Sequence, residues 1–146
     1  MEKSFQISVT IPVYNAADFI RLAVESVLIQ PQTAEVVLVE DCSSDNSREV
    51  CQKIAFENNK VRLFQHTDGW NHGCSASRSL AVQKSSCEYI AFLDADDFYL
   101  PGRFTIAEQM FSIDSELDSM YEVIGMHVEN ETNLQRWKDA RRAMTL

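Results

Sequence analysis

Short apolar runs rich in β-branched residues alternate along this chain with segments of helical periodicity, and this alternation is the strongest constraint on its fold. The strand-like runs are 5–14, 35–39, 61–65 and 89–93, with a fifth strand predicted over 120–126. Helical spacing of apolar residues follows each run, in 17–28, about 45–57, 74–84 and 101–113, and an exposed helix is predicted over 133–144. Such alternation predicts a three-layer α/β/α fold with a mainly parallel sheet.

The length and composition of the chain fit one globular domain. The 146 residues suit a single hydrophobic core, and 45% are hydrophobic against 24% charged. We predict one domain over 1–146, with its core in 5–126 and a polar, helical tail in 127–146. The formal net charge of −9 argues against nucleic acid as a partner and against an anionic membrane as the main one.

The cysteines and the N-terminal segment bear on where the protein works. None of the four cysteines forms a C-x-x-C pair, and no signal peptide and no apolar run of about 20 residues is present. These features predict a cytoplasmic protein. The tail carries four basic side chains, Arg136, Lys138, Arg141 and Arg142. They fit a solvated helix face, and they leave open a peripheral contact at the inner face of the membrane.

Polar clusters follow three of the predicted strands at the point where each strand ends. These clusters are 12–15, 40–45 and 94–97. Ligands of parallel α/β sheets bind at the carboxyl ends of the strands. We therefore expect the three clusters to converge on one edge of the sheet and to form a binding site there.

The third cluster places Asp94, Asp96 and Asp97 directly after an apolar run that we predict to be a buried strand. Carboxylates gathered this closely repel one another, and a divalent cation removes the repulsion. Hard oxygen ligands suit Mg²⁺ or Mn²⁺, which take one or two protein carboxylates together with phosphate oxygens. For Asp97 alone, capping of the next helix is an alternative.

Four segments together resemble family 2 of the GT-A glycosyltransferases. They are TIPVYN at 10–15, VEDCSSDNS at 39–47, NHGCSASR at 71–78 and LDADD at 93–97, with Pro101 behind the last. They occur in the family's order and spacing and cover roughly residues 5–126. The resemblance implies a GT-A fold, of the nucleotide-diphospho-sugar transferase type, in a truncated version.

The resemblance also implies a nucleotide site with residues from every one of these segments. Its members are Pro12, Tyr14, Asn15, Asp41, Arg78 and Asp94. Tyr14 would lie near the uracil face, Asp41 would accept a hydrogen bond from the uracil imide N–H, and Asp94 would contact the ribose. Simpler roles remain open, since Tyr14 can pack in the core, Asp41 can belong to an ordinary turn, and Arg78 can pair with Asp94 in place of the diphosphate.

By the same resemblance the chain is an inverting glycosyltransferase of polysaccharide or cell-wall biosynthesis. It would move a sugar from a nucleotide-diphosphate donor, expected to be a UDP-sugar, to a hydroxyl of a glycan, lipid or protein acceptor. Asp96 and Asp97, the D-x-D carboxylates, would face Mn²⁺ or Mg²⁺.

The resemblance places the catalytic base well downstream of the Asp run, and no residue here is assigned to it. The alternative function is a non-catalytic nucleotide-sugar-binding module that lacks the acceptor half. A sugar nucleotidyltransferase is disfavoured because no glycine follows the first strand. A truncated core would leave apolar surface exposed, so a homodimer is expected.

Overall fold

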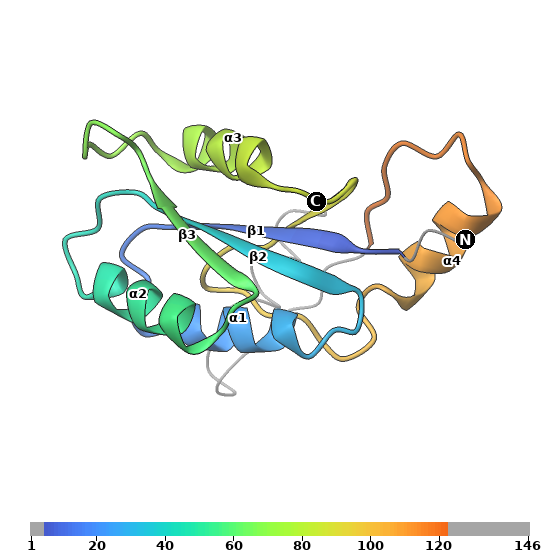
Figure 1. Ribbon diagram of the computed structural model, residues 1–146, viewed down its shortest axis with the longest axis horizontal. Helices are drawn as coiled ribbons and strands as arrows, with labels where there is room; N and C mark the ends of the chain where they lie inside the picture. Colours follow the sequence, from blue (N-terminus) through green and yellow to red (C-terminus); the bar gives the residue numbers. More distant parts are fainter. Residues whose placement is uncertain (1–4, 123–146) are drawn as a thin grey trace, which may run out of the picture. The chain divides into compact units, whose positions relative to one another are not determined.

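The computed structural model describes residues 5–122 and divides the chain into two units, with the boundary between Ser115 and Glu116. The strands and helices of the described residues all belong to the first unit (Figure 1). They are β1 (Ile7–Val13), α1 (Ile20–Leu28), β2 (Thr33–Glu40), α2 (Ser47–Glu57), β3 (Val61–Gln65), α3 (Cys74–Lys84), β4 (Tyr89–Phe92) and α4 (Thr105–Ile113). In the second unit, residues 116–122 form no helix or strand.

The sheet has four strands in the order β3-β2-β1-β4, and every neighbouring pair is parallel. Figure 1 shows α1 and α2 on one face of the sheet and α3 on the other. The chain first winds outward from β1 to β3 and then crosses to pair β4 with the opposite edge of β1. This reversal creates a topological switch point beside β1, where such sheets bind their ligands. The predicted α/β/α fold with a parallel sheet is confirmed.

Alternation along β1 and β2 divides the core between the two faces of the sheet. Ile7, Val9 and Ile11 of β1 are fully or almost fully buried and pack in the same cluster as Ile20 and Val24 of α1. On the other face, a smaller cluster contains Val37, Val39 and Ala81, with Phe64 and Leu80 packed against it. The two central strands are thus fixed from both sides, and the loops after them start from rigid positions.

Several predicted elements differ from the observed ones. The helix predicted from Pro101 begins only at Thr105, because Gly102 has a φ of +78°, which a right-handed helix does not allow. The run 89–93 was predicted to be a buried strand, but residues 89–92 form an edge strand that pairs with β1 alone among the described residues. The first three side chains are half-buried and Phe92 is 55% exposed, while Leu93, just after the strand, is buried. Residues 120–122 of the predicted fifth strand form no strand, and the rest of it lies outside the described residues, as does the predicted helix over 133–144.

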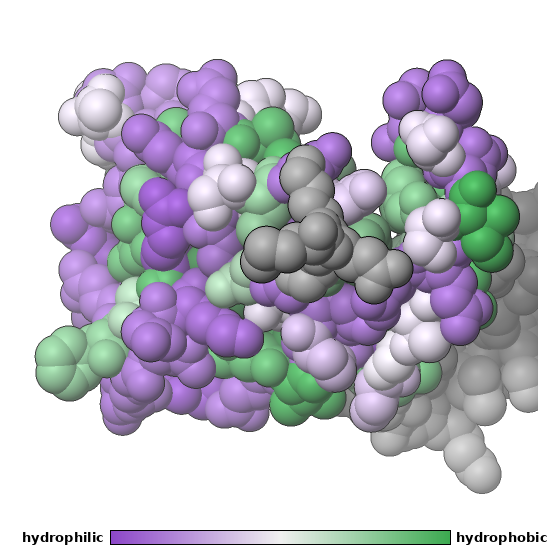
Figure 2. All heavy atoms as spheres, turned by 45° about the vertical axis from the view of Figure 1, so that its right-hand side comes forward, coloured by the Kyte–Doolittle hydropathy of each residue, from purple (hydrophilic) through white to green (hydrophobic). Residues whose placement is uncertain are grey.

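Apolar side chains are exposed along one face of α4. Ile106, Met110 and Ile113 follow one another at the spacing of a single helix face, and the exposed fraction of Ile113 is 80%. Figure 2, which turns the side that carries α4 toward the viewer, shows hydrophobic side chains among hydrophilic ones. The expectation of exposed apolar surface is met here, and the homodimer stays a prediction.

Near the amino end of β2, the buried carboxylate of Glu35 joins the strand to its neighbours by hydrogen bonds. It accepts hydrogen bonds from Ser8 Oγ at 2.7 Å, Arg62 Nη1 at 2.7 Å and the backbone N–H of Ser86 at 2.6 Å. Burial alone would raise the pKa of Glu35, but these hydrogen bonds outweigh it and lower the pKa from 4.5 to about 2. The network therefore favours the ionised carboxylate and ties β1, β2 and β3 together at the end of the sheet opposite the polar clusters.

Glu35→Gln is expected to lower the free energy of unfolding by about 3 kcal/mol at pH 7. This is the free energy that corresponds to a pKa lowered from 4.5 to about 2. A group whose pKa is lowered by folding stabilises above its unfolded pKa, so this contribution is lost as the pH falls from about 4.5 towards 2. Urea unfolding of both proteins at pH 7, 4.5 and 3 measures the difference. Glu25→Gln, a change at an exposed carboxylate, is the control. A stability difference that does not depend on pH would contradict the role of Glu35.

Candidate functional site

A cavity of about 340 Å³ opens where the three polar clusters meet. It is lined by six of the residues that the sequence singled out, namely Pro12, Tyr14, Asn15, Asp41, Asp94 and Asp96. Two further candidates, Arg78 and Asp97, are not among the lining residues. The sheet therefore brings most of the candidate residues to one hollow at the switch point, although they lie far apart in the sequence.

Four more lining residues are Phe19, Asn71, Gly73 and Cys74. Phe19 directly precedes α1, and its side chain is 51% exposed. It lies within the helical pattern predicted for 17–28, and that pattern gave no sign of a place at the cavity. Cys74 is the first residue of α3, and the structure leaves it exposed.

The loops after β1 and β2 are bonded to each other. Asn15, with a φ of +49°, uses its side-chain oxygen to accept the backbone N–H of Ser44 at 2.8 Å. Ser47 Oγ accepts the backbone N–H of Ala16 at 2.8 Å, and Asp45 accepts that of Ala17 at 3.1 Å. These bonds fix the approach of one loop to the other, so several polar residues of the two segments position Tyr14 and Asp41.

Asp45 also serves the helix that follows. Its carboxylate accepts the backbone N–H of Ser47, the first residue of α2, at 2.9 Å. Hydrogen bonds from Ser47 lower the pKa of Asp45. Asp45 therefore satisfies the first backbone N–H of α2, while Ser44 donates both its hydroxyl and its backbone N–H to the side-chain oxygen of Asn15.

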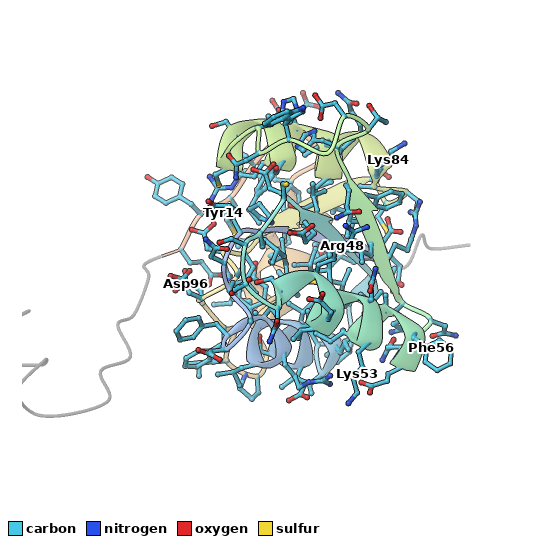
Figure 3. All side chains as sticks on the ribbon, turned by 90° about the vertical axis from the view of Figure 1, so that its left-hand side faces the viewer. Tyr14, Arg48, Lys53, Phe56, Lys84 and Asp96 are labelled. Carbon is cyan, nitrogen blue, oxygen red and sulfur yellow. The ribbon has the colours of Figure 1, made fainter. Side chains whose placement is uncertain are left out.

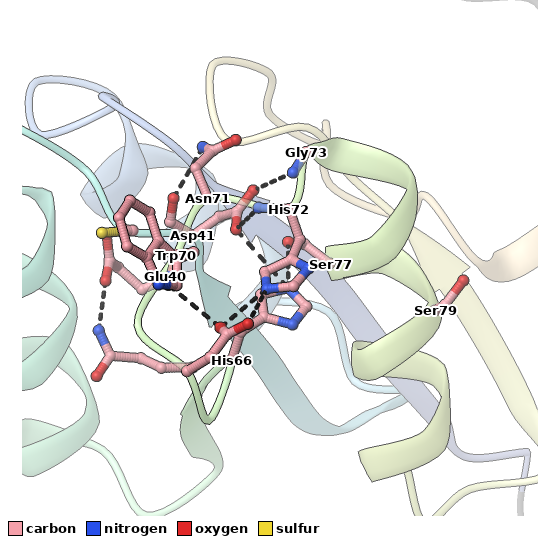
Figure 4. A network of polar contacts seen from close by, with 12 residues as sticks. Glu40, Asp41, His66, Trp70, Asn71, His72, Gly73, Ser77 and Ser79 are labelled. Atoms are coloured by element: carbon pink, nitrogen blue, oxygen red, sulfur yellow. Dashed lines mark hydrogen bonds and ion pairs between the residues drawn. The ribbon is translucent and has the colours of Figure 1, made fainter.

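Asp41 is buried at the end of β2, and its carboxylate binds the loop that leads into α3. One oxygen accepts the backbone N–H of His72 and the other that of Gly73, both at 2.8 Å. The backbone oxygen of Asp41 accepts Asn71 Nδ2 at 2.9 Å (Figure 4). Three consecutive loop residues are therefore anchored on one aspartate, and this anchor forms a wall of the cavity.

The three carboxylates after β4 have different surroundings. Asp94 forms an ion pair with Arg78, which neutralises its charge locally. Burial raises the pKa of Asp97, and the neighbouring carboxylates of Asp96 and Asp94 raise it further. Asp96 is exposed and lines the cavity. Asp96 is thus the carboxylate best placed to meet a ligand, with Asp97 beside it.

A cation bound beside Asp96 would have few protein ligands. Among residues 5–122, no three His, Cys, Asp or Glu side chains are grouped as a ready-made metal site. The donor set at the cavity, the oxygens of Asp96 with Asp97 next in the chain, matches the one or two carboxylates that Mg²⁺ and Mn²⁺ take when phosphate oxygens complete their shell. The residues present therefore fit such an ion.

The cavity lining also includes an accessible aromatic ring. Tyr14 is 54% exposed, so it is not a core residue, and Pro12 and Asp41 lie with it in the lining. Figure 3 shows Tyr14 and Asp96 on the same side of the molecule. A flat ring near a buried carboxylate suits a planar heterocycle that carries a hydrogen-bond donor.

The sequence profile of the family described as "Glycosyl transferase family 2" matches residues 8–142. Over 119 residues the chain is 34% identical to the uncharacterized glycosyltransferase YibD of Escherichia coli, covering 81% of this chain and 33% of YibD. It is also 37% identical to the succinoglycan biosynthesis protein ExoU of Rhizobium meliloti, covering 66% of this chain and 28% of ExoU. The chain thus spans about a third of the length of these relatives.

Solved structures give the same picture. The structure of S. aureus TarS residues 1–349 in complex with UDP-GlcNAc superimposes with a TM-score of 0.61 at 27% identity, covering 86% of this chain and 37% of that one. The same TarS segment in a further crystal structure gives a TM-score of 0.66 at 25% identity. The four-stranded parallel sheet is therefore that of GT-A glycosyltransferases.

Proposed function

This chain belongs to glycosyl transferase family 2, and we propose that its cavity binds the donor, a UDP-sugar, from which the sugar passes to an acceptor hydroxyl with inversion. The observation that carries this proposal is the composition of the cavity lining. The exposed ring of Tyr14 and the buried carboxylate of Asp41 line the same cavity as the exposed carboxylates of Asp94 and Asp96. A nucleoside diphosphate calls for both kinds of lining, since it joins a flat base to a charged diphosphate.

The base would lie at Tyr14 and Asp41. Both carboxylate oxygens of Asp41 already accept a backbone N–H, but a carboxylate offers about four acceptor positions. An unused position can still accept the imide N–H of uracil. The two backbone bonds hold the carboxylate in place, so that this recognition costs little further ordering.

The diphosphate would lie towards Asp96. Asp96, with Asp97 beside it, would hold Mn²⁺ or Mg²⁺, which neutralises the diphosphate and stabilises negative charge on the leaving nucleotide. The side chain of Arg78 is 40% exposed and is paired with Asp94 through one guanidinium nitrogen, so its other exposed N–H groups would be the donors offered to a phosphate oxygen.

In the transfer itself, the acceptor oxygen bonds to the anomeric carbon as the bond from that carbon to the diphosphate breaks. A base takes the acceptor's proton, and the nucleoside diphosphate leaves with the electron pair. We assign no residue of this chain to that base. The alternative function, a binding module without transfer, follows if the base and acceptor site are lacking.

The acceptor and the setting are proposed from the relatives. ExoU is named for succinoglycan biosynthesis, so we propose an acceptor in polysaccharide or cell-wall biosynthesis. We also propose that the protein works in the cytoplasm, at the inner face of the membrane when the acceptor is lipid-linked. No helix among residues 5–122 is long and apolar enough to cross a membrane.

Calorimetry with UDP tests the proposed function. We expect saturable binding of UDP in the presence of Mn²⁺ that falls when the metal is chelated with EDTA, because the acidic end of the cavity repels a diphosphate without it. Absence of UDP binding at any metal concentration would refute donor binding. Hydrolysis of UDP-GlcNAc or transfer to an acceptor would then identify an enzyme, and binding without either would identify a module.

A further inference from the structure

The loop 66–73 forms one wall of the cavity without being a helix or strand. It contains Gly69 and Gly73, both with positive φ, and a turn in which the backbone N–H of Gly69 donates to His66 O at 3.2 Å. Further along the loop, the N–H groups of His72 and Gly73 both lie 2.8 Å from oxygens of Asp41. Side chains of the loop restrain these donors further.

Two imidazoles supply that restraint. His72 Nε2 lies 2.9 Å from both oxygens of Asp68, four residues earlier in the loop. The hydrogen bond from His72 lowers the pKa of Asp68, as does the backbone N–H of Trp70. The ring of His72 stacks on that of His66, with the centroids 4.2 Å apart and the planes at 29°.

The second imidazole joins the loop to the rest of the fold. His66 follows β3 directly, and its Nε2 lies 3.0 Å from Ser77 Oγ on α3 and 3.7 Å from an oxygen of Asp41. Ser77 is fully buried within α3, so His66 contacts a side chain that is itself held in place. Figure 4 shows the result, in which Asp41, His66, His72 and Ser77 form one contiguous cluster between the loop and α3.

We propose that His66, His72 and Asp68 are positioning residues for the nucleotide pocket, which hold the 71–73 backbone against Asp41 through the stacked imidazoles and the Asp68–His72 pair. The consequence for ligand binding rests on the proposed function. The positioning itself does not, because it concerns the loop and Asp41 alone. None of the three side chains lines the cavity, so they act on a nucleotide only through Asp41 and the loop.

Amide hydrogen exchange measured by NMR tests the positioning directly. In Asp68→Ala and His72→Ala, the amides of residues 72 and 73 are expected to exchange about tenfold faster than in the wild type, while those of β1 are unchanged. Thr67→Ala, a change at an exposed residue of the same loop, is the control and should leave residues 72 and 73 protected. Equal exchange in all variants would overturn the proposal, whether or not UDP binds.

A double-mutant cycle with UDP tests the consequence. Each single variant is expected to weaken UDP binding about fivefold with an unchanged melting temperature, and Asp68→Ala/His72→Ala should weaken it no further, because the two side chains act as one pair. His72→Gln, which can still donate to Asp68, should restore part of the affinity. Additive losses, or losses that follow the melting temperature, would show a merely structural role and overturn the proposal. If the wild type itself binds no UDP, the proposed function fails and hydrogen exchange alone decides the positioning.

Discussion

Replacing Asp96 with alanine is expected to abolish the Mn²⁺-dependent binding of UDP. Asp94 is engaged by Arg78, and Asp97 is not among the lining residues, so Asp96 is the carboxylate whose position and charge best serve a cation in the cavity. Removing a residue that hydrogen-bonds to a metal ligand lowers the metal affinity about 10- to 100-fold. Removing the ligand itself should therefore lower the metal affinity at least about 100-fold. Calorimetric titration of UDP with and without Mn²⁺ measures the change.

Glu49→Ala is the matched control for Asp96→Ala. Glu49 is an exposed acidic residue of α2 that does not line the cavity, so the control removes one negative charge without removing a candidate ligand. We expect its UDP affinity to stay within about twofold of the wild type, because salt screens an exposed charge that does not contact the ligand. Should Asp96→Ala keep its dependence on Mn²⁺, the metal is held elsewhere and the role assigned to Asp96 is wrong.

The elements from β1 to α3 could be predicted from the sequence because each carries its own signal. In β1 the apolar residues alternate, and in α1 they recur on one helical face, so the pattern is present whatever the rest of the chain does. The edge position of β4 could not be predicted this way. A run of apolar residues marks a strand, but only the crossover from β3 decides how many neighbours that strand has.

The sequence predicted which residues gather at the site, but it did not predict which residues contact each other there. Strand ends in a parallel sheet meet at one edge, which brings Tyr14, Asp41 and Asp96 to one cavity. The partners of Asp41 lie about 30 residues further along the chain, in a loop without periodicity. The His66–His72 stack was missed for the same reason, since spacing can suggest metal ligands or helix faces but not ring contacts across a loop.

Several side chains of the polar segments form hydrogen bonds within and between these segments. Asn15 was predicted at the nucleotide, and it lines the cavity, but its side-chain oxygen is used on Ser44 of the next segment. Glu40 is buried and accepts the backbone N–H of Ser43, so the acid next to Asp41 shapes the turn. In this chain, much of the motif content builds the geometry around the cavity that Asp41 and Tyr14 line.

The second large effect is expected at Asp41, where Asp41→Asn should change the choice of base. Uracil presents an imide N–H to the carboxylate, whereas cytosine presents a bare nitrogen acceptor that the carboxylate repels. The wild type should therefore bind UDP about 10- to 100-fold more tightly than CDP, the range of a mismatched hydrogen bond to a charged group. In Asp41→Asn the amide can donate to cytosine, so this preference should fall to about twofold or reverse.

Asp41→Asn should also reduce stability, because Asp41 anchors the loop as well as facing the proposed base. The new amide nitrogen would face the backbone N–H of either His72 or Gly73, which the carboxylate oxygen accepts in the wild type. That buried donor would lose its partner, at a cost of about 1–3 kcal/mol. Asp18→Asn, the same change at an exposed residue before α1, should alter neither the stability nor the ratio of UDP to CDP affinity. Titrations of both nucleotides, below the melting temperature of each variant, distinguish the outcomes. A variant that is less stable but keeps the full preference for UDP would show that Asp41 only anchors the loop and that another group reads the base.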